Sequence, residues 1–147
     1  MDEHLTKIFN ALCIYCHNMR TLHWKTRGLD FDAKHELVDE YRKQMGEYID
    51  DIAEIMLMCN INPPTLVDVV KSAAKDSKER YIILSTDKYY DNKEIFEQVN
   101  KMFAHLVELY TKVTKSSALS GDIVGKLEEH QYFFHKEYKY KGVNRLK

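Results

Sequence analysis

Glycine and proline are scarce in this chain of 147 residues, which has 5 glycines and 2 prolines. Both residues interrupt helices, so their scarcity argues against a turn-rich β architecture and favours long helices. The 3 cysteines are an odd number without framework spacing, which excludes a disulfide-stabilised fold and fits a reducing compartment. No apolar run approaches the roughly 20 residues of a membrane span, and the N-terminus lacks the pattern of a secretory signal. We therefore expect a cytoplasmic protein that does not insert into a membrane.

The chain also has no large excess of positively or negatively charged residues. The chain has 22 Lys plus Arg against 23 Asp plus Glu, a net charge of -1, so it has no general attraction to nucleic acid. Any DNA binding would need a local patch. With 44% hydrophobic and 31% charged residues, the composition and length predict a single domain over residues 1–147 with a packed core.

Apolar residues recur at three- and four-residue steps in four long segments. The first segment runs from Leu5 to His23 and is closed by basic residues and Gly28, with Asp30 and Asp32 as N-caps for the next. The remaining long segments are residues 33–59, residues 95–113 behind a capping box at 91–94, and residues 122–138.

The prolines mark the break after the second segment. Pro63 and Pro64 stop that helix, and Thr65 caps a short one that ends near residue 74. Residues 81–84 are either a buried turn or an early start of the next helix. The sequence thus predicts an all-α four-helix bundle with a short extra helix between helices two and three.

The second predicted helix carries a polar face beside its apolar one. Four residues with metal-binding side chains lie 4, 11 and 4 positions apart: His35, Asp39, Asp50 and Glu54. At about 100° per residue they fall within an arc of roughly 100°. Fe(II) and Mn(II) accept such ligands, and bundles hold dimetal carboxylate sites. The same spacing is also typical of a solvated helix face, so both interpretations stay open here.

Helix geometry limits how a metal site could form. Asp39 and Asp50 lie about 16 Å apart along one helix, too far to surround one metal pair. The Glu-x-x-His steps of a bundle-interior site are absent from the sequence. An antiparallel two-fold contact centred near Gln44 would bring the His35 end of one copy to the Glu54 end of another. We therefore predict a site shared between two chains.

The same residues closely resemble the signature of the Dps family, the DNA-binding proteins from starved cells, or miniferritins. That signature is His-Trp, then His twelve residues after the first His, Asp four on, Asp eleven further and Glu four beyond. This chain fills it with His23, His35, Asp39, Asp50 and Glu54. The order around residues 63–65 and the segment 127–130 are also similar, so the likeness covers most of the chain.

The resemblance implies an assembly and an activity. Members of the family form hollow dodecamers with dinuclear ferroxidase sites at their two-fold interfaces, oxidise Fe(II), usually with hydrogen peroxide, and store ferric mineral. It implies that His23, His35 and Asp39 come from one subunit and that Asp50 and Glu54 come from its partner. Dinuclear iron, or Mn or Zn in its place, is the expected metal, and hydrogen peroxide or dioxygen is the expected oxidant.

Two further positions follow from the resemblance. Trp24 matches the family's tryptophan beside the site, which is thought to intercept oxidising equivalents; the alternative is an aromatic side chain that packs at the end of its helix. Asp122 is the candidate for the family's acidic threefold pore, although it stands about one turn closer to His130 than the family pattern does.

The C-terminal tail, residues 136–147, is basic. Over residues 131–147 one acidic residue, Glu137, faces five basic ones: Lys136, Lys139, Lys141, Arg145 and Lys147. Such a tail could bind DNA phosphates or could simply be solvated. The alternative to a ferroxidase is therefore a DNA-binding architectural protein with a secondary metal site, which would be associated with the nucleoid.

A competing motif lies in the first helix. Cys13-Ile14-Tyr15-Cys16-His17 has the c-type haem attachment pattern, and a structural zinc site at the same residues is a third interpretation without a fourth ligand. Because Cys16 continues the apolar line, helix packing is the favoured role of these cysteines. The sequence does not assign a role to Cys59.

Overall fold

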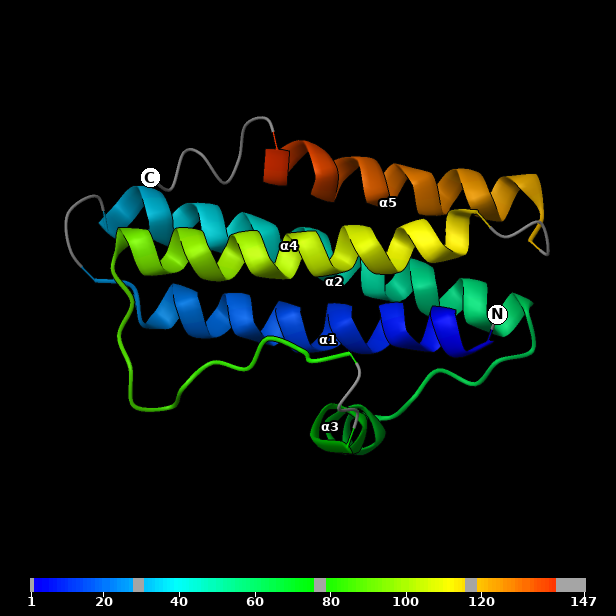
Figure 1. The fold of residues 1–147 in the computed structure, drawn as a ribbon, viewed down its shortest axis with the longest axis horizontal. Coiled ribbons are helices and arrows are strands. Elements are labelled where there is room, and N and C mark those ends of the chain that lie inside the picture. Colours follow the sequence, from blue (N-terminus) through cyan, green and yellow to red (C-terminus); the bar gives the residue numbers. More distant parts are fainter. Residues whose placement is uncertain (1, 28–30, 76–78, 116–118, 140–147) are drawn as a thin grey trace.

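The computed structural model describes residues 2–27, 31–75, 79–115 and 119–139. These residues contain four long helices and one short helix. They are α1 (Asp2–Trp24), α2 (Phe31–Met58), α3 (Leu66–Lys75), α4 (Asn92–Thr114) and α5 (Gly121–Lys139). The pairs α1–α2 and α4–α5 run antiparallel, and α3 lies against α1 outside the bundle (Figure 1). The predicted four-helix bundle with a short extra helix is confirmed.

The core lies between the four long helices, where the predicted apolar lines meet. Met19 on α1, Met45 on α2, Phe103 on α4 and Phe134 on α5 have no exposed surface. Tyr15 on α1 is equally buried. In the described segments no helix combines the length and the low polarity that a bilayer span requires.

Polar caps fix where the helices begin. Asp91 and Glu94 form the predicted capping box at the start of α4. Thr65 Oγ1 accepts a hydrogen bond from the Asp68 amide at 3.4 Å, which confirms it as the cap of α3. The last predicted helix begins at Gly121 rather than Asp122, because Ser120 Oγ accepts the amide hydrogen of Ile123 at 3.4 Å.

The end of α2 differs slightly from the prediction. The helix ends at Met58, and Asn60 adopts the left-handed conformation with a φ of 60°. This lets the Ile61 amide donate to the Met56 carbonyl at 2.8 Å. The helix is therefore closed before the chain reaches Pro63. Gly28 and Asp30, which were expected to close α1 and to cap α2, lie outside the described residues.

Residues 79–91 run back along α1 toward the start of α4 (Figure 1). They are not helical, so the early helix start considered for residues 81–84 is wrong and the buried-turn alternative holds in part: Tyr81 is buried and Ile83 is exposed. Hydrogen bonds explain this, since Asn18 donates to the Ile82 carbonyl at 2.7 Å and the Ile82 amide donates to Tyr15 Oη at 3.2 Å.

The end of α1 is held against the start of α4. The Tyr90 amide donates to the Lys25 carbonyl at 2.8 Å, and the Arg27 amide donates to the Tyr90 carbonyl at 3.0 Å. Thr26 Oγ1 also donates to the Leu22 carbonyl. These bonds fix the position of the last turn of α1, which carries His23.

Candidate metal centre

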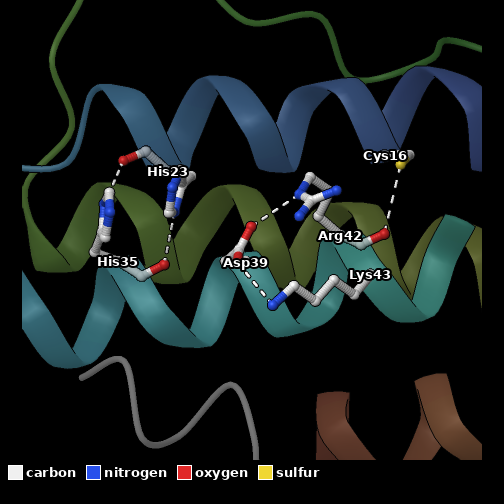
Figure 2. Close-up of polar contacts among 6 residues, drawn as sticks. All are labelled: Cys16, His23, His35, Asp39, Arg42 and Lys43. Carbon is white, nitrogen blue, oxygen red and sulfur yellow. Dashed lines mark hydrogen bonds and ion pairs between the residues drawn. The ribbon is translucent and has the colours of Figure 1, made fainter.

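His23 and His35 lie face to face where α1 passes the first turns of α2 (Figure 2). Their ring centroids are 3.5 Å apart and the planes are inclined by 21°. His23 Nδ1 lies 2.9 Å from the His35 carbonyl oxygen, and His35 Nδ1 lies 2.7 Å from the His23 carbonyl oxygen. Because a carbonyl only accepts, each Nδ1 carries a proton, and in the neutral ring the lone pair is then on Nε2.

This arrangement is the one expected of metal-binding histidines. An imidazole that ligates a metal usually donates its other N–H to a carbonyl or carboxylate, which fixes the tautomer and the ring orientation. Both rings are only partly buried. The two residues, which the sequence placed at the end of one helix and the start of the next, are therefore brought together with their tautomers matched.

Asp39 is one turn further along α2 and is held by two cations (Figure 2). Arg42 Nε donates to Asp39 Oδ1 at 2.8 Å, and Lys43 Nζ lies 3.3 Å from Asp39 Oδ2. The hydrogen bond from Arg42 is the main cause of the lowered pKa of Asp39. The carboxylate is thus ionised and paired within its own helix.

Asp50 and Glu54 lie at the other end of the same unbroken helix and are exposed. At 1.5 Å per residue, the 15 residues from His35 to Asp50 correspond to about 22 Å, so a single chain does not bring the two groups together. Among the described residues, no group of three or more His, Cys, Asp or Glu side chains is placed to hold a metal ion. The two groups of predicted ligands therefore stay apart within one chain, and the shared site remains a prediction.

A second polar cluster begins beside Asp50. Asp51 Oδ2 lies 2.8 Å from Nε2 of His130, whose Nδ1 lies 2.8 Å from Tyr110 Oη, and Tyr48 stacks on the imidazole with centroids 3.7 Å apart. His130 is fully buried, and burial lowers its pKa. His130 therefore takes up a proton at a higher pH in the unfolded chain than in the folded chain. The free energy of unfolding consequently falls as the pH drops below about 6.5.

The structure also shows the surroundings of Trp24 and Asp122, the two further positions that the resemblance implies. Trp24 is exposed, and its indole contacts the ring of His17 edge-on, with centroids 6.0 Å apart. Asp122 lies in the first turn of α5 and lines a cavity of about 370 Å³ together with Asp51 and Glu54. A role for Trp24 near iron and a role for Asp122 in a pore both remain predictions.

The basic tail is described only where it belongs to α5. Lys136 Nζ lies 5.9 Å from the ring centroid of Tyr132, and Lys139 is the last residue of the helix. The expected DNA contacts Lys141, Arg145 and Lys147 lie outside the described residues.

The residues of the haem-like motif face different sides of α1. Cys16 Sγ donates to the Arg42 carbonyl on α2 at 3.5 Å, whereas Cys13 and His17 line a cavity beside α3. Both thiols pack against the core, which agrees with the favoured packing role. Because they point apart, the three residues do not form the zinc site considered from the sequence. Burial raises the pKa of Cys13 to about 11 and also raises that of Cys16.

Two features of the site were missed from the sequence. The cations on Asp39 were detectable, because Arg42 and Lys43 follow it at i+3 and i+4, where helical side chains meet. The Asp51–His130–Tyr110 chain had no comparable signal, since its members come from three helices.

Comparison with known proteins agrees with this fold. A family model described as a ferritin-like domain matches residues 2–136. The DNA protection during starvation protein of Helicobacter pylori is 24% identical over 123 residues, which are 83% of this chain and 78% of the relative. Antigen TpF1 of Treponema pallidum is 30% identical over 129 residues, which are 84% of this chain but only 64% of that protein's length.

Solved structures of similar fold include two bacterial proteins. The crystal structure of antigen TpF1 matches with a TM-score of 0.81 at 22% identity, over 93% of this chain and 85% of the other. A Dps protein from Vibrio cholerae O1, described as a member of a broad superfamily of ferritin-like diiron-carboxylate proteins, matches with a TM-score of 0.79 at 18% identity, over 99% and 85%.

Proposed function

The chain belongs to the ferritin-like family and is similar to Dps proteins, and on this premise we propose that it is a ferroxidase. We propose also that it stores the oxidised iron. Its substrate is Fe(II), which it oxidises with hydrogen peroxide at dinuclear sites shared between two-fold related copies. The ferric product collects inside a hollow dodecamer, which protects DNA from oxidative damage.

The stacked pair His23 and His35 is the observation that carries this proposal. Both Nδ1 atoms face a carbonyl oxygen, so the neutral rings have their lone pairs on Nε2, which is the atom that would bind a metal ion. Two imidazoles alone are too few for iron, which also binds carboxylates. The missing oxygen ligands must come from elsewhere.

Asp50 and Glu54 are the carboxylates we assign to the partner's half of the site. They are exposed, stand four residues apart on one face of α2, and lie about 20 Å or more from the histidine pair of their own chain. An antiparallel two-fold contact between two α2 helices brings them beside the other chain's histidines. Asp39, on the same face as the histidines, is the remaining candidate ligand.

The dinuclear arrangement explains the choice of oxidant. Two Fe(II) ions each give up one electron, and one hydrogen peroxide takes both electrons and two protons as its O–O bond breaks, which yields two waters. Because the electrons are delivered together, no hydroxyl radical is released. The histidines and carboxylates hold the two ions close enough for this, and the same ligands would also accept Mn or Zn.

The experiment is a comparison of iron oxidation with and without protein. We expect Fe(II) and peroxide to give ferric product faster with the purified protein than in buffer, and the product to stay soluble inside an assembly of dodecamer mass. The double variant Asp50→Asn, Glu54→Gln should oxidise iron at the buffer rate, because it lacks the anionic oxygen ligands. Absorbance of ferric iron after mixing gives both rates.

A matched control is available on the same helix. Glu36 and Glu40 are also exposed and also four residues apart, and each follows a proposed ligand by one residue, about 100° further round the helix. Glu36→Gln, Glu40→Gln therefore makes the same change of charge on another face of α2. That variant should oxidise iron like the unmodified protein. If protein and buffer give equal rates, or if both double variants behave alike, the assignment of Asp50 and Glu54 is wrong.

DNA binding is the second function we propose to test, because the relative from Helicobacter pylori is named for DNA protection and the C-terminus of this chain is basic. Deleting residues 139–147 removes Lys139, Lys141, Arg145 and Lys147. We expect at least about a tenfold loss of affinity for duplex DNA, and loss of binding in added salt, since phosphate contacts release counterions. A gel-retardation titration measures both.

The exposed lysines of α3 supply the control for the deletion. Lys71→Gln, Lys75→Gln removes positive charge from another surface and should leave retardation unchanged. Equal retardation before and after the tail deletion would place any DNA-binding surface elsewhere. Absence of retardation in every variant would remove the DNA function and leave the ferroxidase proposal intact.

A further inference from the structure

We propose that Arg42 is a built-in competitor of the metal at Asp39 and thereby sets the affinity of one of the two iron positions. This inference rests on the proposed function, because it concerns ligands of the shared site. It identifies a residue that sets metal affinity without contacting the metal itself.

The geometry of the ion pair is the first argument. Arg42 Nε is 2.8 Å from Asp39 Oδ1, which is a close charge-assisted hydrogen bond. The two residues are three apart on α2, so the guanidinium is tethered within reach of the carboxylate at a high effective concentration. A metal ion that uses this carboxylate must displace a cation that cannot diffuse away.

Burial distinguishes Arg42 from the second cation. The side chains of Asp39 and Arg42 are 23% and 24% exposed, so their attraction is only partly screened by water. Lys43 is 67% exposed and lies 3.3 Å from the other carboxylate oxygen. Exposed pairs of this kind contribute little, so Lys43 should hardly resist displacement.

The surroundings hold Arg42 in place. Its carbonyl accepts the thiol hydrogen of Cys16 at 3.5 Å, across the contact between α1 and α2 (Figure 2). Arg42 therefore lies at the contact between α1 and α2 that also holds His23 and His35, and Asp39 lies between the histidines and Arg42 along α2 (Figure 2). A divalent ion at Asp39 would be a few ångströms from the guanidinium that the 2.8 Å bond holds beside the carboxylate, and would be repelled by its positive charge.

The consequence is ordered filling of the site. An ion bound by the histidine pair does not use the Asp39 carboxylate, whereas an ion at Asp39 must release Arg42 first. The second position should therefore be the weaker one. Its affinity depends on Arg42, although the side chain supplies no metal-binding atom.

Calorimetric titration of the assembled protein with Co(II) tests this without any turnover. We expect a strong and a weak binding event, and Arg42→Gln should tighten the weak event about five- to tenfold. Lys43→Gln, which makes the same change of charge, should tighten it less than about twofold. Arg42→Met keeps the apolar stem and should reproduce Arg42→Gln if the glutamine variant does not assemble.

A double-mutant cycle gives the decisive comparison. Asp39→Asn should abolish the weak event, and Arg42→Gln added to Asp39→Asn should then change nothing. If Arg42→Gln leaves the weak event unchanged, or tightens Co(II) binding equally in both backgrounds, the competition does not exist. Loss of the strong Co(II) event in a His23→Gln, His35→Gln variant is required by the proposed function, so its retention there refutes the shared site itself rather than the role of Arg42.

Discussion

Two inactive variants should restore iron oxidation to each other when they are assembled together. One variant lacks His23 and His35, and the other lacks Asp50 and Glu54; each alone should oxidise iron at the buffer rate. After random mixing, half of the two-fold pairs contain one chain of each kind, and one of their two sites then has intact histidines and intact carboxylates. About a quarter of the sites should therefore be restored.

The comparison depends on subunit exchange, so the variants are co-expressed or unfolded and reassembled together. Both must reach the same assembly mass as the unmodified protein. If every ligand came from a single chain, each site in the mixture would lack some of them and no activity would return. An inactive mixed assembly would thus move the chemistry out of the two-fold interface and into the bundle.

His130→Leu should destabilise the fold more than any surface substitution, by about 3 kcal/mol of unfolding free energy, because it leaves buried polar groups without their partner. The imidazole is fully buried, stacks on Tyr48, and links Tyr110 to Asp51. Leucine fills part of the space and satisfies neither hydrogen bond. Urea unfolding of the assembled protein, followed by circular dichroism, measures the loss.

Two companion variants separate the causes. Tyr110→Phe keeps the packing and removes one hydrogen bond, so it should cost about 1 kcal/mol. His17→Leu changes an exposed histidine in the same chemical way and should stay within about 0.5 kcal/mol of the unmodified protein. Equal stabilities for the His130 and His17 variants would show that the buried chain of hydrogen bonds contributes nothing.

Much of the fold could be predicted because local signals agreed with one another. The capping pair Asp91 and Glu94, and the apolar periodicity of the four long segments, depend on neighbours within a few residues. The conformation of residues 81–84 could not be predicted from the sequence, because their apolar pattern fits a helix start as well as a buried turn. Tyr15 and Asn18 decide their conformation through hydrogen bonds from α1, which no local pattern encodes.

The candidate site shows the same division. The spacing of His35, Asp50 and Glu54 on one helix was readable because helix geometry converts sequence distance into position. The stacking of His23 on His35 was not, since it depends on how the chain turns between α1 and α2. The ion pair between Asp39 and Arg42 was readable in principle from their three-residue separation, but only the structure shows that both side chains are largely hidden from water.

The thiols of α1 affect how the protein would tolerate hydrogen peroxide, the oxidant of the proposed reaction. Peroxide attacks the thiolate form of cysteine, and a pKa of about 11 leaves Cys13 with about one thiolate in ten thousand at pH 7. Burial raises the pKa of Cys16 in the same direction. Placing both sulfurs against the core keeps them out of the oxidation ladder that leads to sulfenic and sulfinic acids. If the proposed reaction takes place, Cys13 and Cys16 would therefore be protected from the peroxide that it consumes.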